Sequence, residues 1–232
     1  MQTSITPRAS ASADIEFWFD FSSVYSYPSV MRIDSLAASH DLVVQWRPFL
    51  LGPVFKALGW ETSPFLLQKQ KGDYMWRDIA RQCEKYGLPW QQPSVFPRRA
   101  LLPMRIALLG EGQSWMVPFC QEVMRRCFVL DQAVDDRTIM DALLSGLGLP
   151  APALLQDAET EENKTALRMR TERAKEKGIF GAPTFFVGDE MFWGDDRLDD
   201  AVRYAVSARS SQNPLATAGF PIDCSKQKTG MP

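Results

Sequence analysis

The amino-terminal part of the chain carries apolar patterns that predict a strand, a helix and a second strand. Residues 15–21 are aromatic and partly alternating, which is typical of a strand. Apolar residues then recur at helical spacing as far as His40, and a second short apolar run covers residues 42–46. Two strands joined by one helix are expected to lie parallel, with a right-handed crossover between them.

The middle of the chain, residues 53–177, predicts helices only. In its last segment the acidic residues come first and Lys and Arg come late, which the helix dipole favours. Gly178 follows where a terminating glycine is expected. Glycines and prolines separate the candidate helices, and the Gly146–Pro152 segment is one of these breaks. The candidate helices cover residues 67–86, 100–110, 114–128, 136–145 and 160–177.

Strand patterns return after Gly178. Residues 184–187 and 190–193 are apolar runs joined by a Gly-Asp turn, which predicts a hairpin, and a final helix is expected from Asp196 to about Arg209. The order of elements predicts an α/β fold, with a thioredoxin-like core interrupted by a long all-helical insertion. The predicted parts are a flexible leader (1–13), the first part of the thioredoxin-like domain (14–52), the helical insertion domain (53–177), the second part of the thioredoxin-like domain (178–209) and a polar tail (210–232).

The composition is that of an ordinary soluble globule, with 232 residues of which 45% are hydrophobic and 23% charged. A net charge of −2 lacks the basic surplus that binding to nucleic acid needs, so no nucleic-acid partner is expected. The most apolar stretch, residues 42–55, contains Arg47 and two prolines and is shorter than the ~20 residues of a membrane span. Residues 1–13 lack the apolar segment of a secretory signal, which predicts a cytoplasmic protein, although their serines and missing acids also fit an organelle-targeting segment.

Few side chains are available for metal or nucleophilic chemistry. The four cysteines, at 83, 120, 127 and 224, form no CxxC motif. Cys120 and Cys127 are expected two helical turns apart, about 10.5 Å, which is too far for a disulfide, so free thiols are predicted. With His40 as the single histidine, a zinc site built on several histidines is excluded and no metal is predicted. The nucleophile-elbow, dinucleotide and Walker A motifs are also missing, which predicts chemistry carried by an imported group.

A serine motif stands at the predicted junction between the first strand and the first helix. A helix amino terminus offers unpaired N–H groups and a partial positive charge, so an anion is stabilised there. Thiol-disulfide enzymes of this fold place a CxxC at that junction, whereas here both cysteine positions are serines, Ser23 and Ser26. The motif therefore predicts a hydroxyl that donates to the thiolate of a bound ligand. The alternative is that Ser22, Ser23 or Ser26 only caps the helix.

Two further motifs flank the predicted hairpin. Pro183 precedes its first strand, where a thioredoxin-like core has a cis-proline whose predecessor, here Ala182, pairs with an extended peptide. The alternative is a proline that only marks an edge strand. Asp195 and Asp196 open the last helix, either as capping residues or as part of a polar clamp for the carboxylate and ammonium groups of a ligand.

Aromatic and cationic residues gather after the second predicted strand. Lys56 and Trp60 lie in the segment that leaves this strand, and Tyr74 follows among further aromatics and cations. Together they predict a pocket for a flat, anionic, aromatic substrate. The alternative is a set of core residues surrounded by solvated charges.

Taken together, these motifs resemble the 2-hydroxychromene-2-carboxylate isomerase family. This family is close kin of the kappa-class glutathione transferases, and both are placed in the DsbA-like branch of the thioredoxin superfamily. The resemblance covers roughly residues 14–206. It rests on FDFSSVYS (19–26), on RPFLLG (47–52) with Phe55-Lys56, on YMWRD (74–78) and on the stretch 178–197.

The resemblance implies a glutathione-binding site. Ser23 matches the catalytic serine that contacts the glutathione sulfur, and Tyr25 is expected close by. Ala182 matches the residue that pairs with the cysteinyl backbone, ahead of the cis-proline. Asp195 and Asp196 match the positions that hold the γ-glutamyl end.

Two positions depart from the family pattern. Val24 replaces the proline that usually follows the serine, and Trp60 stands where kappa-class transferases typically have an asparagine that contacts glutathione. An aromatic side chain at that position favours a substrate with a stacked ring.

The resemblance implies a glutathione-dependent cis–trans isomerase that works in the catabolism of aromatic compounds. Its substrate is a small aromatic carboxylate such as 2-hydroxychromene-2-carboxylate, its product is trans-o-hydroxybenzylidenepyruvate, and glutathione is a recycled cofactor. A homodimer is also expected from the relatives. The alternatives are a kappa-class-like glutathione transferase or peroxidase, and a non-catalytic glutathione- or peptide-binding protein of the same fold.

Overall fold

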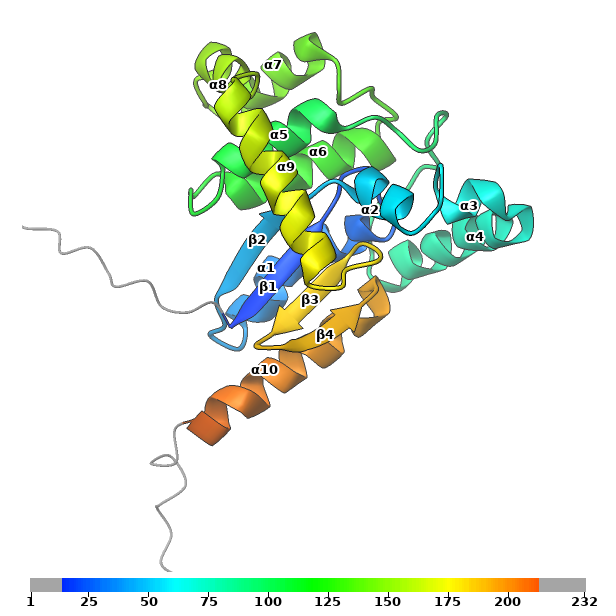
Figure 1. Cartoon of the computed structure of the whole chain (residues 1–232), viewed down its shortest axis with the longest axis vertical. Coiled ribbons are helices and arrows are strands. Elements are labelled where there is room, and N and C mark those ends of the chain that lie inside the picture. Colours follow the sequence, from blue (N-terminus) through cyan, green and yellow to red (C-terminus); the bar gives the residue numbers. More distant parts are fainter. Residues whose placement is uncertain (1–13, 213–232) are drawn as a thin grey trace, which may run out of the picture.

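The computed structural model describes residues 14–212, and its centre is a single four-stranded sheet (Figure 1). The strands are β1 (Ile15–Phe19), β2 (Val44–Pro48), β3 (Thr184–Val187) and β4 (Glu190–Trp193), in the spatial order β2-β1-β3-β4. β1 runs parallel to β2 and antiparallel to β3, and β3 forms an antiparallel hairpin with β4. The predicted parallel pair and the predicted hairpin are therefore confirmed.

Helices cover both faces of this sheet. The helices α1 (Ser26–Ala38) and α10 (Leu198–Gln212) lie on one face, whereas α2 (Leu51–Ala57) and α9 (Glu161–Glu176) lie on the other (Figure 1). Side chains alternate between the two faces along a strand, so the two central strands, β1 and β3, contribute to both packing layers. Phe17 joins the cluster that contains the α1 and α10 side chains, while its neighbour Trp18 joins the smaller cluster beneath α2 and α9.

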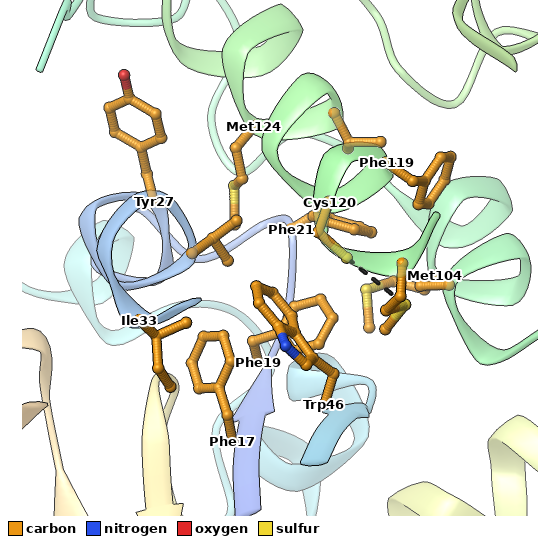
Figure 2. Close-up of a cluster of buried hydrophobic side chains, with 14 of the residues drawn as sticks. Phe17, Phe19, Phe21, Tyr27, Ile33, Trp46, Met104, Phe119, Cys120 and Met124 are labelled. Atoms are coloured by element: carbon orange, nitrogen blue, oxygen red, sulfur yellow. Dashed lines mark hydrogen bonds between the residues drawn. The ribbon is translucent and has the colours of Figure 1, made fainter. Parts of the chain in front are cut away.

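Aromatic rings form the centre of the larger cluster. Phe17 stacks on Phe19 and on Phe185, with ring centroids 5.2 Å apart in both pairs, and meets the edge of Trp46 at 5.0 Å. Such pairs contribute about 0.5–1.5 kcal/mol each beyond the area that they bury. Figure 2 shows this group facing α6 (Met116–Phe128) of the helical insertion, where Phe119 packs against Phe21 at 6.2 Å. The insertion therefore shares its core with the sheet.

β1 ends two residues earlier than the sequence pattern predicts, because Asp20 turns the chain. One oxygen of its buried carboxylate accepts a hydrogen bond from Ser22 N at 2.7 Å, and the other accepts from Leu51 N at 2.7 Å. β2 likewise begins at Val44 rather than at residue 42, because Leu42 N donates to a carbonyl of the last turn of α1 and so belongs to the preceding turn.

The insertion between β2 and β3 is all helical, as predicted, and its five long helices match the predicted ones to within three residues. In Figure 1 the helices α5 to α8 lie together at one end of the molecule, and α3 and α4 project at its side. α9 leads from the first group back across the sheet. Besides α2 and α9, these helices are α3 (Pro64–Leu67), α4 (Lys69–Lys85), α5 (Leu101–Leu109), α6 (Met116–Phe128), α7 (Arg137–Gly146) and α8 (Ala151–Asp157).

Three short helices, α2, α3 and α8, were not predicted from the sequence pattern. Each has a proline in its first turn, namely Pro53, Pro64 and Pro152. Proline is tolerated there, because the first-turn N–H groups have no partner within the helix. The expectation that the Gly146–Pro152 segment only separates helices was therefore wrong, since α8 already begins at Ala151.

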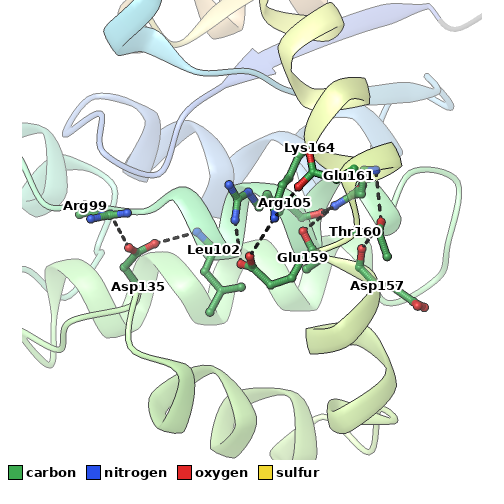
Figure 3. Close-up of polar contacts among 11 residues, drawn as sticks. Arg99, Leu102, Arg105, Asp135, Asp157, Glu159, Thr160, Glu161 and Lys164 are labelled. Carbon is green, nitrogen blue, oxygen red and sulfur yellow. Dashed lines mark hydrogen bonds and ion pairs between the residues drawn. The ribbon is translucent and has the colours of Figure 1, made fainter.

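Polar contacts fix the loops between the long helices (Figure 3). Asp135 accepts a hydrogen bond from Leu102 N at 2.7 Å, at the amino terminus of α5, and pairs with Arg99 at 2.7 Å. A carboxylate at this position also complements the helix dipole. On the other side of α5, Arg105 pairs with Glu159 at 2.7 Å and connects α5 to the segment that leads into α9.

The cysteines are free and buried where the structure describes them. Cys120 and Cys127 both lie on α6, as predicted, and burial raises the pKa of Cys83 to about 12. Cys224 and the predicted leader (1–13) lie outside the described residues, and so does the predicted tail from residue 213 on. α10 continues to Gln212, three residues into the region predicted as tail. Across residues 14–212, no helix combines the length and the hydrophobicity that a membrane crossing requires.

Candidate active site

A cleft of about 820 Å³ opens between the thioredoxin-like core and the helical insertion. Its volume falls in the ~300–1,000 Å³ range of small-molecule sites. Residues from both parts of the thioredoxin-like core line it, together with residues of α2, of the α3–α4 region and of the loop before α5. The predicted site residues that line the cleft are Ser23, Tyr25, Trp60, Tyr74, Ala182, Asp195 and Asp196.

Ser23 lies in the loop between β1 and α1, where it is 8% exposed. Its hydroxyl donates to the carbonyl oxygen of Ala182 at 2.8 Å, which joins two residues that are 159 positions apart in the sequence. The same hydroxyl oxygen accepts from Ser26 N at 3.3 Å, at the first residue of α1. Ser23 therefore contacts the helix terminus, as the capping alternative requires, and also faces the loop before β3.

The predicted cis-proline is present at Pro183, because the Ala182–Pro183 peptide bond is cis. The Pro183 carbonyl is occupied, since it accepts from Gly194 N at 3.0 Å. The carbonyl of Gly181 accepts from the Thr184 hydroxyl at 2.9 Å. Among these three neighbouring carbonyls, that of Ala182 is therefore the one whose partner is a side chain of the cleft.

Asp195 is buried at the first residue of the short 3₁₀ helix that precedes α10, with 2% of its surface exposed. Its Oδ1 accepts from the Ser29 hydroxyl at 2.7 Å and from Arg32 Nη1 at 3.4 Å. Its Oδ2 is buried and has no hydrogen-bond partner within the structure. Burial raises the pKa of this carboxyl to about 6, against the lowering effects of Ser29 and Arg32. An orphaned carboxylate oxygen in a cleft is suited to a cationic ligand group.

Asp196 differs from its neighbour, because 62% of its side chain is exposed. It lies at the rim of the cleft and pairs with Arg197 at 3.0 Å. The two predicted acidic residues therefore occupy different environments: Asp195 belongs to the buried wall and Asp196 to the solvated edge.

Tyr25 and Tyr74 meet at a carboxylate of α4. The Tyr25 hydroxyl donates to Asp78 Oδ2 at 3.0 Å, and the Tyr74 hydroxyl lies 3.5 Å from Asp78 Oδ1. Burial, followed by the nearby Asp78 charge, raises the pKa of Tyr25. Tyr25 is therefore a neutral phenol at physiological pH, with its proton directed at Asp78.

Trp60 lies at the rim of the cleft with 38% of its surface exposed, and its ring packs against Phe55 at 5.5 Å. The structure does not bring Lys56 to the cleft: this residue lies on the exposed side of α2. Because α2 itself was not predicted, the direction of Lys56 was not available from the pattern. Lys71, on α4, lines the cleft instead.

Several cleft residues were not among the predicted site residues. Trp193 is half exposed and packs edge-on against Phe180 at 4.7 Å, and its indole lies so close to Gly181 that a Cβ atom there would clash with it. The sequence held one signal for this contact, since Gly181 and Trp193 belong to the two motifs that flank the hairpin. Asp78 belongs to the YMWRD stretch (74–78) and Lys71 to the cations that follow the second strand, although neither was named as a site residue. No local signal marked others, which include Phe65, Gln82 and Arg98.

No group of three or more His, Cys, Asp or Glu side chains within residues 14–212 is arranged to hold a metal ion. The polar atoms that line the cleft include a serine hydroxyl, a backbone carbonyl and an unpartnered carboxylate oxygen. These groups suit a peptide-like ligand with an N–H group and an ammonium group.

Sequence comparisons identify relatives over most of the chain. A family profile described as DSBA-like thioredoxin domain matches residues 14–205. The 2-hydroxychromene-2-carboxylate isomerase of Sphingobium xenophagum is 29% identical over 194 residues, which cover 83% of this chain and 97% of the relative. The enzyme of the same name from Pseudomonas sp. (strain C18) is 30% identical over 79% of this chain and 86% of its own length. Glutathione s-transferase kappa 2 of Caenorhabditis elegans is 23% identical over 79% of this chain and 88% of its own length.

Comparison with solved structures points to the same relatives as the sequence comparisons do. The structure of a 2-hydroxychromene-2-carboxylate isomerase superposes with a TM-score of 0.78 at 25% identity. The match covers 88% of this chain and 99% of that protein, so it includes the helical insertion as well as the sheet.

Proposed function

Since this chain belongs to the DSBA-like thioredoxin domain family, and within it to the 2-hydroxychromene-2-carboxylate isomerase family that its motifs resemble, we propose that it is a glutathione-dependent cis–trans isomerase. Relatives that carry the isomerase name support an enzyme of the isomerase type in aromatic catabolism. The proposed substrate is a small aromatic carboxylate such as 2-hydroxychromene-2-carboxylate, and the proposed product is trans-o-hydroxybenzylidenepyruvate.

One observation carries the proposal more than any other: the Ser23 hydroxyl lies 2.8 Å from the Ala182 carbonyl oxygen inside the cleft. This places a hydrogen-bond donor, the positive end of α1 and the residue before the cis-proline in one small region. A thiol-disulfide enzyme needs its own cysteine there. Ser23 offers a hydroxyl instead, so the sulfur has to come from a ligand.

The cleft fits glutathione at both ends. The Ala182 carbonyl can accept the backbone N–H of the cysteinyl residue, as in the addition of a strand to a sheet edge. The orphaned Oδ2 of Asp195 can accept from the ammonium group of the γ-glutamyl end, which removes an unsatisfied buried acceptor. The kappa-class transferase among the relatives supports a glutathione ligand for the family.

When bound, glutathione supplies a thiolate that adds reversibly to a conjugated carbon and so permits rotation about the former double bond. Ser23 has to change its hydrogen bond for this chemistry. In the structure its proton is directed at the Ala182 carbonyl, and the ligand N–H replaces it there, so the hydroxyl becomes free to donate to the sulfur. A hydrogen bond to an anion is stronger than one to a neutral carbonyl, so this exchange favours the ionised thiol.

The aromatic lining suits a ring substrate beside the sulfur. Phe55, Trp60, Phe65 and Tyr74 line the cleft on the side of the insertion. Flat rings pack favourably against such side chains, and they gain about 0.5–1.5 kcal/mol per aromatic pair beyond buried area.

The test is turnover of 2-hydroxychromene-2-carboxylate by the purified chain with and without glutathione, followed by mass spectrometry of the products. The proposal expects isomer formation that requires glutathione in catalytic amounts, with glutathione recovered unchanged. A product that retains glutathione indicates a transferase, as the kappa-class relative favours. Glutathione binding without turnover of any electrophile indicates a binding protein. Turnover that does not depend on glutathione refutes the proposed cofactor.

The proposal also includes a cytoplasmic location and a homodimer, both of which are sequence-based predictions. Analytical ultracentrifugation of the full chain tests the dimer, and fractionation of the source cells tests the location.

A further inference from the structure

One of the residues that line the cleft is a buried arginine with an unused hydrogen-bond donor. Arg98 lies in the loop before α5 and is 8% exposed. Its Nη2 atom pairs with Asp131, whereas its Nε–H group is buried and has no partner within the structure. An unsatisfied buried donor costs about 1–3 kcal/mol, so its presence in a ligand cleft calls for an explanation.

The protein holds Arg98 in place from the insertion side. Asp131, in the loop after α6, accepts both from Arg98 and from Ser94 N, the latter at 2.9 Å. Asp131 itself adopts a left-handed backbone conformation, with φ of +52°, which is uncommon for a residue other than glycine. Together with the Asp135 contacts to Arg99 and Leu102, which Figure 3 shows, these bonds tie the loop at both of its ends.

The other cations of the cleft are weaker candidates for binding an anion. Arg99 is 77% exposed and is paired with Asp135. Lys71 is exposed on α4. Water screens charges at such positions, whereas a buried guanidinium acts through a lower local dielectric and loses no side-chain entropy on binding. Among the cations that line the cleft, Arg98 is therefore the one whose contact with a ligand anion is expected to contribute most to the binding free energy.

We infer that Arg98 binds the carboxylate of the aromatic substrate through its Nε–H group. The inference rests on the proposed function for the identity of the acid, and it assigns a residue that lies outside the motifs described above. One carboxylate oxygen satisfies the free donor, and the Asp131 pair stays intact. The substrate ring then lies between Arg98 and the aromatic side chains on the insertion side, including Phe96, which packs against Trp76 at 4.9 Å.

Two variants test this role without leaving an unpaired charge. Arg98→Lys keeps a cation beside Asp131 but removes the Nε–H donor. The double variant Arg98→Met with Asp131→Asn removes both charges of the pair. The matched control is Arg105→Lys, because Arg105 has a similar exposure and a similar carboxylate partner but does not line the cleft.

The probes are chromone-2-carboxylate, a planar analogue, and its methyl ester, with binding measured by calorimetry in the absence of glutathione. The wild type and the control are expected to bind the acid more tightly than the ester. Both cleft variants are expected to bind the acid about ten- to a hundredfold more weakly, the range for a hydrogen bond between charged groups, with ester binding unchanged. In turnover assays the KM for the acid should rise by a similar factor while kcat changes little.

Glutathione binding, followed through tryptophan fluorescence, separates this role from a general loss of structure. The variants are expected to bind glutathione as the wild type does. The inference is overturned if both variants keep the preference for the acid, if the wild type has no such preference, or if acid and glutathione binding are lost together. If the wild type binds the acid through Arg98 but shows no turnover, the proposed isomerase fails and the carboxylate subsite stands.

Discussion

Replacement of Ser23 by alanine removes the donor that is proposed to stabilise the thiolate. In the structure this hydroxyl makes a neutral hydrogen bond to the Ala182 carbonyl, which contributes about 0.5–1.5 kcal/mol. A bond from the same hydroxyl to a thiolate contributes about 1.5–3 kcal/mol. In the complex the hydroxyl faces the sulfur, so ionisation of bound glutathione gains roughly the difference between a neutral and an ionic hydrogen bond, about 1.2 kcal/mol, which corresponds to about one pKa unit.

The expected result is that Ser23→Ala raises the pKa of the bound glutathione thiol by about one unit. The remaining depression, below one unit, comes from the amino terminus of α1, whose contribution is about 0.3–1 kcal/mol and is unaffected by the substitution. Ultraviolet absorbance of the thiolate, recorded against pH in the saturated complex, measures this directly. Turnover should fall about tenfold at neutral pH and recover at alkaline pH, where the thiol ionises without help.

The matched control is Ser35→Ala, which removes an exposed hydroxyl of the same helix that donates only to the Arg32 carbonyl. It should leave the thiol pKa unchanged. If Ser23→Ala also leaves this pKa unchanged, the proposed role of the hydroxyl is refuted, even if activity falls.

Three further substitutions test the walls of the site. Asp195→Asn should abolish glutathione binding. Because burial raises the pKa of the Asp195 carboxyl to about 6, its ionised form costs stability as pH rises through that value. In the free protein the substitution should therefore raise the unfolding free energy by up to about 3 kcal/mol above pH 6 but not near pH 4, which thermal melts at several pH values measure. Gly181→Ala should displace Trp193 and weaken glutathione binding several-fold in fluorescence titrations. The free energy of unfolding in urea should change by less than about 1 kcal/mol, because Trp193 is half exposed. Unaltered glutathione binding would contradict a role for this contact. Asp20→Ala should cost about 2–4 kcal/mol in urea unfolding because two backbone N–H groups, including that of Leu51, lose their acceptor, and Asp20→Asn should cost less.

Much of the fold was predictable because its signals are local. The aromatic alternation of β1, the hairpin turn and the helical spacing of the longer helices each depend on neighbouring residues only. The helices α2, α3 and α8 were missed because a proline in the first turn looks like a helix break in the sequence. The end of β1 depends on a contact from Asp20 to Leu51, and no pattern within the strand encodes it.

The residues of the candidate site also divide into those that the sequence predicted and those that depend on distant contacts. Ser23 and Ala182 were expected together because a thioredoxin-like core has its cis-proline facing the amino terminus of the first helix, and the hydrogen bond between the two residues agrees with this. Arg98 was not expected, because its burial depends on Asp131, which lies 33 positions further along the chain. The side chain of Lys56 points away from the cleft because of a helix that the pattern did not reveal.

The separation of 159 positions between Ser23 and Ala182 also constrains when the cleft appears as the chain is made. Closing a flexible loop of that length costs about 4–5 kcal/mol of chain entropy, so the two ends of the core meet only after the intervening helices have become compact. During synthesis the first strands and the serine emerge long before their partner residues. A nascent chain therefore has no complete binding site until the hairpin has left the ribosome, and it depends until then on the helical segment to shield its aromatic strand.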